Sequence, residues 1–248
     1  MILKDISFLS PQENILYDEV LLDLAEHDQG EEVLRFWESG MYFVVLGRIS
    51  KTVDDLNLEQ VMKDKIPVVR RASGGGTVVQ GKGCLNYSLV LSKEKTPQVS
   101  DLGVSYQFIL KKIVLALREL HIETDYFPIS DIAMIKNRKK VSGNAQKRGR
   151  RFILHHGTIL YDFDIDLIER YLKIPLAIPE YREDRSHKEF VANVNLNAED
   201  IKGQIAALFN VEHSESDLTQ PEREHLAAYI RKRDVLIDLY PNATGLEN

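Results

Sequence analysis

The sequence predicts an α/β fold built as one large domain. Short apolar runs rich in β-branched residues alternate along the chain with longer segments whose apolar residues recur at the helical period. The chain has 248 residues, of which 44% are hydrophobic and 28% are charged. This length is sufficient for a real hydrophobic core, and the balance is that of an ordinary globular protein.

Charge and cysteine content exclude several classes of protein. The net charge of −6 argues against a general nucleic-acid binder, because phosphate contacts need a basic excess. A single cysteine, Cys84, excludes an internal disulfide and a cysteine-based zinc site. The N-terminal residues 1–14 lack an apolar signal core, and no run approaches the length of a membrane span. We therefore expect a cytoplasmic protein with no membrane and no nucleic-acid partner.

The first third of the chain predicts one long helix and several strands. Residues 10–27 are expected to form the helix, with Ser10 as N-cap, Pro11 in the first turn and Glu13 completing a capping-box pattern. A short helix is expected over residues 54–64. The strands expected here are residues 33–39 and 41–48, joined by a hairpin-like turn at Ser39 and Gly40, and residues 65–72.

The remainder continues the alternation of strands and helices. Strands are expected over residues 85–92, 131–135, 139–146 and 151–162. Helices are expected over residues 104–120, on one face of the sheet, 164–173, 197–209, and from Pro221 to about Arg233. Residues 174–196 are expected to be an irregular surface loop, and residues 235–240 an apolar tail.

Three consecutive glycines, Gly74, Gly75 and Gly76, lie between two of the apolar runs. Glycines let a ligand lie against the main chain, and their exposed N–H groups can form an anion-binding nest. Arg70 and Arg71 just before them could grip a phosphate or carboxylate with forked donors. A glycine-rich hairpin with surface arginines explains the same residues equally well. The spacing matches neither the dinucleotide-binding fingerprint nor the P-loop.

Half of residues 136–151 are basic, in a chain that is acidic overall. On composition alone, a solvated basic loop or a nucleic-acid-binding patch is the simpler interpretation. Lys140, however, leads directly into the segment Val141–Gly143, so we expect it to be held on rigid backbone. A fixed ammonium beside a glycine-lined pocket suits negative charge that develops on a phosphoryl or acyl oxygen.

Several segments match a known pattern in order and spacing. They are "NILYDEVLL", "VVLGRISK", "RRASGGGTV" with the following "LNYS", "KKVSGNAQ" and "HHGTIL". From about residue 10 to 210 the chain thereby resembles the lipoate–protein ligases, within the biotin/lipoate ligase and lipoyl/octanoyl transferase superfamily. The resemblance implies a mixed, largely antiparallel sheet with helices on one side. It also implies a catalytic domain over residues 1–210, followed by a short helical appendage over residues 211–248.

The reaction implied by the resemblance has two steps. Lipoate attacks the α-phosphate of ATP to give lipoyl-adenylate and pyrophosphate, and a lysine of an acceptor domain then takes the lipoyl group. Because both first reactants are anionic, arginines, a lysine and Mg²⁺ are expected to screen their approach. Acyl-adenylates hydrolyse in water, so residues 136–151 are expected to close over the site as a covering loop.

The resemblance also assigns roles to residues at matching positions. Lys140 corresponds to the family's essential lysine and is the expected catalytic residue. The lipoyl and phosphate pocket would be lined by Arg71, Ser73, Gly74, Gly75 and Gly76, with Arg48 as a further substrate-side contact and Gly143 and Ala145 close by. The nucleotide would be bound by Asp131, Lys140, His156, Gly157 and Thr158, and Asp131 is also the expected metal ligand.

Two places depart from the best-known ligase pattern. Gln80 and Gly81 stand where many members have His-Asp, and Cys84 stands where Asn is common. These differences concern the lining of the acyl pocket and so the choice between lipoate and octanoate.

An acyltransferase of the same superfamily is the main alternative. One branch uses a cysteine in the segment before Asp131, but residues 124–130 contain none. We expect Cys84 to be a buried small hydrophobe rather than a nucleophile. A cysteine-free branch relies on lysine alone, so ATP-independent transfer of octanoyl or lipoyl groups between carrier proteins stays open.

Two further alternatives belong to other classes. A non-catalytic nucleic-acid binder would use residues 136–151 and survive the substitution Lys140→Ala. A metal site at His155 and His156 is disfavoured, because adjacent strand residues point to opposite faces.

The implied partners are apo lipoyl domains of 2-oxoacid dehydrogenase E2 subunits or the glycine-cleavage H protein. The expected enzyme is a monomer. The family's larger members have an accessory domain much longer than the tail here, so a separate accessory protein could be needed for adenylation.

Overall fold

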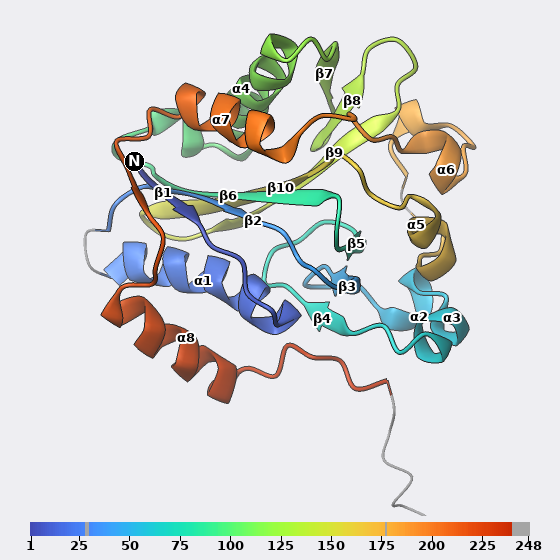
Figure 1. Ribbon diagram of the computed structural model, residues 1–248, viewed down its shortest axis with the longest axis horizontal. Helices are drawn as coiled ribbons and strands as arrows, with labels where there is room; N and C mark the ends of the chain where they lie inside the picture. The colour runs from blue at the N-terminus through green and yellow to red at the C-terminus, as the bar shows by residue number, and fades with distance from the viewer. Residues whose placement is uncertain (28–29, 177, 240–248) are drawn as a thin grey trace, which may run out of the picture.

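An eight-stranded sheet forms the centre of the molecule (Figure 1). The structure is a computed structural model, and it describes residues 1–27, 30–176 and 178–239. The strand order is β11-β1-β2-β6-β10-β9-β8-β7. β1 pairs in parallel with β2 and β11, and the other neighbours are antiparallel. The strands are β1 (Ile2–Asp5), β2 (Val33–Trp37), β6 (Cys84–Ser92), β7 (Thr124–Phe127), β8 (Asp131–Met134), β9 (Lys140–Arg148), β10 (Phe152–Leu160) and β11 (His213–Glu215). The predicted mixed, largely antiparallel sheet is confirmed.

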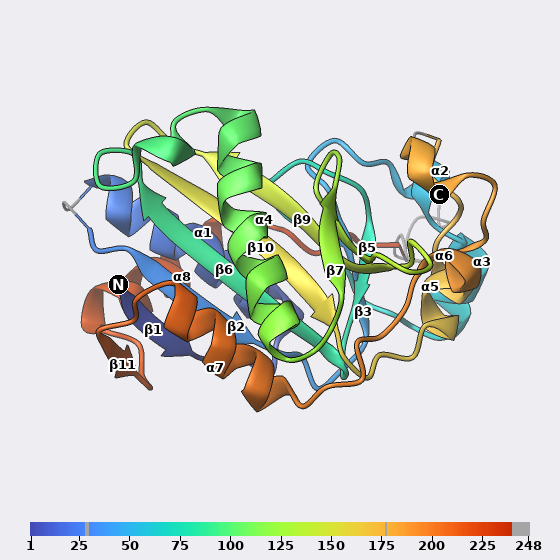
Figure 2. The same ribbon diagram turned by 90° about the horizontal axis from the view of Figure 1, so that it is seen from above.

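Helices cover both faces of this sheet, so the expectation of helices on one side was wrong. Helices α4 (Leu102–Glu119) and α7 (Ala198–Leu208) lie on one face, and α1 (Pro11–His27) and α8 (Gln220–Lys232) lie on the other (Figures 1 and 2). The reason is visible in β6, where all nine residues are buried. Successive residues of a strand point to opposite faces, so a strand buried throughout needs cover on both sides.

A second, three-stranded sheet lies on the α1 side of the main sheet (Figure 1). Its order is β4-β3-β5, with β3 (Phe43–Leu46) parallel to β4 (Val68–Arg70) and antiparallel to β5 (Val78–Gln80). Two predictions are corrected by this sheet. The expected hairpin at Ser39 and Gly40 is absent from the described residues, since β2 joins the main sheet and β3 the small one. The glycine-rich segment is likewise no hairpin, because β3 lies between β4 and β5.

The expected helix over residues 54–64 is divided into α2 (Thr52–Asp55) and α3 (Leu58–Lys63). Leu56 between them is buried, adopts an extended conformation and forms an isolated β-bridge with Leu172. The pairing with Leu172 therefore interrupts a helical pattern that is continuous in the sequence.

Most other predicted elements are confirmed, with differences at their ends. The backbone N–H of Glu13 donates to Ser10 Oγ at 3.5 Å, as an N-cap requires. The expected irregular loop over residues 174–196 contains η2 (Glu180–Arg182) and α6 (His187–Phe190), and α5 (Asp166–Tyr171) precedes it. A further 3₁₀ turn, η1 (Pro97–Val99), precedes α4, while no range was predicted for strands β1, β5, β7 and β11.

The described part of residues 211–239 packs onto the rest of the chain. β11 joins the edge of the main sheet, and α8 packs against α1. Beyond α8, Arg70 N–H donates to Val235 O and Ile237 N–H donates to Val68 O, each at 2.8 Å, so this segment adds to the edge of β4. Tyr240, the last residue of the expected apolar tail, lies outside the described residues. No helix among the described residues is long and apolar enough to cross a membrane.

Candidate functional site

A row of polar and small residues crosses four neighbouring strands on the α1 face of the main sheet. Arg35 of β2 pairs in register with Ser88 of β6. His156 of β10 pairs with both Ser88 and Ala145 of β9. Residues that pair directly across strands point to the same face, so these four side chains form the floor of the candidate site.

Asp18 of α1 lies over this row and forms hydrogen bonds with Arg35 and Ser88. Its Oδ1 accepts a hydrogen bond from Arg35 Nη1, and its Oδ2 accepts one from Ser88 Oγ, both at 2.6 Å. His156 Nδ1 is 3.5 Å from Oδ2. Burial alone would raise the pKa of Asp18, but the Arg35 guanidinium and the hydrogen bonds from His156 and Ser88 hold that pKa below its ordinary value. Asp18 is therefore a buried carboxylate that stays charged.

The glycine loop, residues 71–77, is held by the side chain of Arg71. Its Nη2 donates to the carbonyl oxygens of Gly74 and Gly76, at 2.6 and 2.7 Å. Because the C=O of a trans peptide points opposite to the N–H that follows it, the Gly75 N–H points away from Arg71. Among the described residues, no acceptor pairs with the N–H groups of Gly75 or Gly76. Gly75 has φ +82°, a conformation that favours glycine. These donors are exposed and unpaired, as an anion-binding nest would require.

This arrangement corrects the expected role of the two arginines. Arg71 is 8% exposed, and burial lowers its pKa to about 10, which leaves it charged at neutral pH. Arg70 Nη1 donates to the carbonyl oxygens of Gly47 and Ser50, at 2.9 and 2.7 Å. Both guanidinium groups therefore shape loops, where the sequence had suggested a forked grip on a ligand anion.

Ser73 connects the glycine loop to the floor. Its Oγ accepts a hydrogen bond from Arg71 Nε at 2.9 Å and lies 2.6 Å from His156 Nε2. The backbone carbonyl of Ser73 accepts from Arg48 N–H at 2.9 Å. The Arg48 side chain is exposed, so the structure places the backbone of Arg48, and not a buried side chain, against the loop.

Lys140 begins β9, and its ammonium is fixed at the edge of the same face. Lys140 Nζ is 2.8 Å from Asp131 Oδ1, and the backbone carbonyl of Lys140 accepts from Ala192 N–H at 2.9 Å. A Cβ built on Gly143 would lie 3.0 Å from Lys140 Nζ, so the ammonium lies directly over that glycine. The expectation that Lys140 is held on rigid backbone is confirmed.

The segment before α6 packs over the Lys140–Asp131 pair. Tyr181 of η2 donates its hydroxyl to Asp131 Oδ2 at 2.7 Å. Its ring packs against Phe127 and Phe190, with centroids 4.7 and 5.2 Å apart. Both carboxylate oxygens of Asp131 are thus bonded within the described part of the chain.

The glycine loop and Lys140 meet across β9. A Cβ built on Gly75 would lie 3.6 Å from Ala145 Cβ, so the loop rests on Ala145. Gly143, beneath the Lys140 ammonium, is two residues before Ala145 and hence about 7 Å away along the strand. The structure therefore brings the predicted loop, Lys140, Asp131, Gly143 and Ala145 to one place.

Gly157 has a packing role on the opposite face. A Cβ at this position would lie 1.9 Å from Asn144 Oδ1 and 2.6 Å from Tyr87 Oη, which are hydrogen-bonded to each other. The Tyr87–Asn144 hydrogen bond therefore crosses Gly157 and requires a glycine there. Thr158 pairs in register with Asn86 and points to the same face as His156.

Four residues of the site had no sequence prediction: Asp18, Arg35, Ser88 and Tyr181. Asp18 lies 138 positions from His156, so no local motif joins them. A signal was nevertheless present. Asp18 falls on the face of the helix that also has the buried residues Leu21 and Leu22, where an acidic residue needs a partner.

Cys84 and the histidine pair match their expectations. Cys84 is fully buried, and burial raises the pKa of its thiol, as expected for a packing residue. His155 points to the α4 face, where Gln146 Nε2 lies 3.1 Å from its Nδ1, while His156 points to the α1 face. Among the described residues, no group of three or more His, Cys, Asp or Glu residues could hold a metal ion.

The surroundings of Asp131 bear on its expected metal role. Mg²⁺ is held in proteins by one or two carboxylates together with substrate phosphates. Within the described ranges, Asp131 is the only carboxylate that bonds Lys140, and Lys140 and Tyr181 engage both of its oxygens. In this arrangement the residues do not fit a resident Mg²⁺, and such an ion would have to arrive with the phosphates of a nucleotide.

The basic segment is largely a strand rather than a loop. Residues 140–148 are β9, which lies between β10 and β8, so the expectation of a covering loop was wrong for them. Lys147 pairs with Glu19 at 3.0 Å, and Arg148 Nη2 donates to Ser100 O at 2.6 Å. Side chains committed to these internal partners are poorly suited to a nucleic-acid patch.

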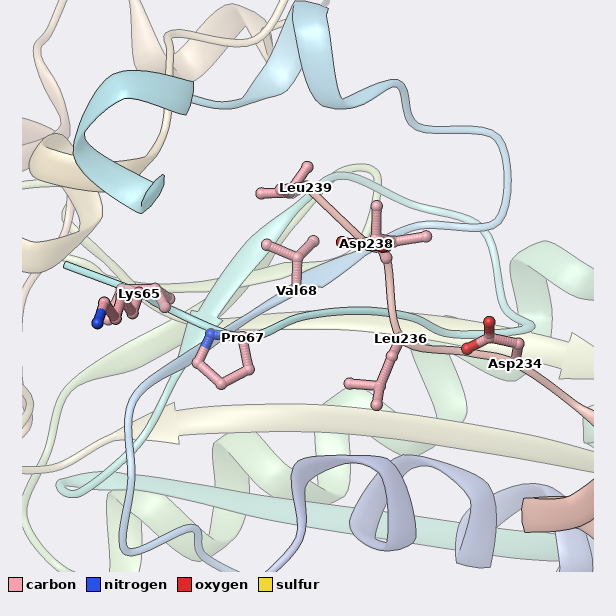
Figure 3. Close-up of a pocket in the computed structure, with 9 residues that line it drawn as sticks. Lys65, Pro67, Val68, Asp234, Leu236, Asp238 and Leu239 are labelled. Atoms are coloured by element: carbon pink, nitrogen blue, oxygen red, sulfur yellow. The ribbon is translucent and has the colours of Figure 1, made fainter. Parts of the chain in front are cut away.

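A hollow between β4 and the C-terminal segment lies apart from this chemistry (Figure 3). Residues 65–68 line one side and residues from 234–239 the other. None of its lining residues is a candidate site residue.

Comparisons with known proteins give a consistent set of relatives. The family model described as "Lipoyl protein ligase A/B catalytic domain" matches residues 10–208. A putative lipoate-protein ligase A of Schizosaccharomyces pombe is 28% identical over 192 residues, which cover 77% of this chain and 51% of that protein. The octanoyltransferase LipM of Clostridioides difficile is 26% identical over 242 residues, covering 85% and 88% of the two chains.

Solved structures show the same fold. A chain from the archaeal lipoylation system of Thermoplasma acidophilum, described as a bi-partite lipoate protein ligase and its E2 lipoyl domain, superposes with a TM-score of 0.80. It is 22% identical, and the match covers 93% of this chain and 92% of that one. A lipoate-protein ligase A bound with ATP gives a TM-score of 0.77 at 21% identity, over 93% and 94% of the two chains.

The chain spans between half and two thirds of the length of the first curated relatives, 51% of one and 62% of the other. The match therefore does not assign the activity of either whole relative to this chain. The matched region nevertheless includes all the residues assembled above, from Asp18 to Tyr181, and most of the chain. The chain belongs to the lipoyl protein ligase A/B catalytic domain family.

Proposed function

We propose that this chain is a lipoate–protein ligase that uses ATP to form lipoyl-adenylate and transfers the lipoyl group to a lysine of an acceptor domain. The observation that supports this most is the position of Lys140. Its ammonium is fixed over Gly143, about two strand residues from a loop that presents unpaired N–H groups. A preorganised cation beside such donors stabilises charge that develops on phosphoryl oxygens.

In the first step, a carboxylate oxygen of lipoate attacks the α-phosphorus of ATP. The bond to the bridging oxygen breaks, and pyrophosphate leaves. Both reactants are anionic, so the Lys140 ammonium and the N–H groups of Gly75 and Gly76 reduce their repulsion and position them. Mg²⁺ would enter bound to the ATP phosphates and further neutralise their charge.

In the second step, an amine of the acceptor lysine attacks the acyl carbonyl, and AMP leaves. The mixed anhydride needs shelter from water until the acceptor arrives. Because β9 cannot serve as a cover, we assign this role to the segment around Tyr181, which packs over Lys140 and Asp131. The proposed acceptors are apo lipoyl domains of E2 subunits or of the H protein.

The test is incubation of the purified protein with lipoate, MgATP and an apo lipoyl domain. We expect a mass shift of the domain by one lipoyl group that requires ATP. Lys140→Ala should abolish it, whereas the neighbouring Lys139→Ala should not. A lipoyl domain that gains no mass with wild-type protein and ATP would contradict the proposal.

ATP-independent octanoyl or lipoyl transfer is the second candidate, because the match to LipM covers 88% of that protein. Cys84 cannot supply the thiolate for it, since its side chain is buried and its pKa is raised. The same assay discriminates the two functions. A shift of the acceptor that occurs without ATP, from an octanoylated carrier protein as donor, would favour the transferase.

A further inference from the structure

Ser73, His156 and Asp18 form a hydrogen-bonded chain that the adenylation step does not use. The three residues come from the glycine loop, from β10 and from α1. Ser73 Oγ is 2.6 Å from His156 Nε2, and His156 Nδ1 is 3.5 Å from Asp18 Oδ2. We propose that this chain is a proton relay that takes the proton from the attacking amine during acyl transfer to the acceptor lysine. The inference rests on the proposed function and deepens its second step.

The direction of the relay follows from Arg71. Arg71 Nε has only a proton to offer and donates it to Ser73 Oγ at 2.9 Å. The hydroxyl proton of Ser73 must therefore point to another acceptor, and His156 Nε2 is within 2.6 Å. A neutral imidazole that accepts at Nε2 has its own proton on Nδ1, which faces Asp18. The hydrogen-bond network thus assigns the tautomer that a general base needs.

Asp18 is held in the orientation that such a base requires. Arg35 and Ser88 bond its two oxygens at 2.6 Å, so the carboxylate cannot turn away from His156. The 3.5 Å distance from Nδ1 is at the outer limit of a hydrogen bond. When the imidazole takes up a proton, the contact between His156 and Asp18 becomes a charge-assisted hydrogen bond. The carboxylate then stabilises the imidazolium that the relay forms.

The charged groups around His156 favour this role. From α1 it faces Asp18, whose charge is balanced by Arg35 of β2, and the loop contributes Arg71 through Ser73. Its β9 partner is the uncharged Ala145. The adjacent His155 lies on the other face of the sheet and is buried.

Atoms and charges balance in the proposed step. The neutral amine of the acceptor lysine attacks the acyl carbonyl carbon, and the bond between that carbon and the phosphate oxygen breaks, so AMP leaves with the electron pair. The surplus proton on nitrogen passes to Ser73 Oγ as the Ser73 proton passes to His156 Nε2. The imidazolium, paired with Asp18, then returns its proton to water.

Separate measurement of the two half-reactions tests the relay. His156→Gln preserves a polar group beside Ser73 but removes the base, and His225→Gln, at a half-buried position on α8, is the matched control. We expect His156→Gln to lower lipoate-dependent ATP–pyrophosphate exchange by a factor at least about tenfold smaller than the factor by which it lowers transfer. Single-turnover transfer from preformed lipoyl-adenylate to an apo lipoyl domain should fall by about 10²- to 10⁴-fold. The acid-limb inflection in the pH profile of transfer should also disappear. His225→Gln should change neither rate.

Several results would overturn the proposal. Equal losses in both half-reactions would mean that His156 only holds the adenylate, and an unchanged transfer rate would mean that it is not the base. An ester-linked acyl group on Ser73, found by intact mass after mixing enzyme and lipoyl-adenylate without acceptor, would make Ser73 a nucleophile. Ser73→Ala is the second variant if His156→Gln does not fold, with the same selective loss of transfer expected.

The design separates this inference from the proposed function. Wild-type protein that makes no lipoyl-adenylate from ATP, yet transfers from the preformed compound, contradicts the ATP-dependent function and leaves the relay measurable. Wild-type protein that transfers from neither source overturns both.

Discussion

Lys140 differs from the neighbouring lysines in what surrounds its ammonium. The Lys139 ammonium contacts the carbonyl of Lys188 at 3.4 Å on the exposed side, and Lys147 pairs with Glu19 under α1. Lys140 alone of the three lies over a glycine, Gly143, among the described residues. The pair joins this partly buried ammonium to the buried carboxylate of Asp131, which holds the ammonium in place.

Gly143→Ala tests this positioning without removing any charge. The added methyl group would lie 3.0 Å from both Cε and Nζ of Lys140, and the end of the lysine side chain must then shift by a few tenths of an ångström. Because misplacement of a catalytic group lowers the rate steeply, we expect ATP–pyrophosphate exchange to fall by about tenfold or more. The free energy of unfolding should stay within about 0.5 kcal/mol of the wild type.

Gly203→Ala on α7 is the control, since nothing lies within 4 Å of the position that its added methyl group would take. Exchange at the wild-type rate in both alanine variants would contradict the claim that the ammonium must lie over position 143.

His155 gives a prediction about pH. Burial, with a smaller contribution from nearby His156, lowers the pKa of His155 from the ordinary 6.5 to about 3. Below pH 6.5 the unfolded chain therefore binds a proton that the folded chain does not. From pH 6.5 down to about 3, this group reduces the free energy of unfolding by up to about 1.4 kcal/mol per pH unit.

The measurement is urea denaturation between pH 6 and 4.5, above the range in which most carboxylates titrate. We expect His155→Gln to weaken the loss of stability with falling pH, measured against His225→Gln, a half-buried histidine of α8, as the control variant. Identical slopes in the wild type and in His155→Gln would show that His155 does not titrate as its burial implies.

Among the elements, β9 shows where pattern reading succeeded and where it failed. A strand was correctly expected over most of this segment, and Lys140 was correctly expected on rigid backbone. The high density of basic residues suggested a loop. That reading failed because Lys147 and Arg148 have partners in α1 and before α4, and such partners are invisible in the local sequence.

Strand pairing was the least predictable property of the elements. Residues 33–37 and 43–46 were both expected to be strands, and both are. Two adjacent strands with a short turn normally form a hairpin. Here β2 is inserted between β1 and β6, so β3 has to pair elsewhere, and only the packing of the whole sheet decides this.

The segment after α8 supports the edge of β4, the strand that precedes the glycine loop. Ile237 N–H donates to Val68 O at the edge of β4, and β4 leads directly into the glycine loop. Ile237→Pro removes that donor, so we expect the free energy of unfolding to fall by about 1–3 kcal/mol. Chemical denaturation measures this, and a smaller decrease in pyrophosphate exchange should accompany it.

Leu236→Pro is the matched control, because the Leu236 N–H has no acceptor among the described residues. Equal destabilisation by both proline variants would mean that backbone restriction, rather than the lost hydrogen bond, explains the effect.

At the scale of the whole molecule, the site is an assembly of segments that are distant in sequence. The sequence predicted the fold class, most helices and strands, and the grouping of Lys140, Asp131 and the glycine loop, the last by resemblance to a family. It did not predict Asp18, because its contacts with Arg35 and His156 form only when α1 is laid on the sheet. The two-part division at residue 210 stays a prediction.

The relatives of this chain include proteins named as lipoate-protein ligases and proteins named as octanoyltransferases. The matching family model describes the catalytic domain of lipoyl protein ligases A and B. What separates the two activities is whether the acyl group arrives as a free acid with ATP or already attached to a carrier. The proposed assignment to the ligases therefore depends on the first half-reaction, where Lys140 acts.

Lipoate-dependent ATP–pyrophosphate exchange tests this assignment most directly. The account predicts exchange by the wild-type chain that requires lipoate, that falls by at least about 10²-fold in Lys140→Ala, and that persists in Lys139→Ala. Exchange that is absent from the wild-type chain, or that is undiminished in a folded Lys140→Ala variant, would contradict it.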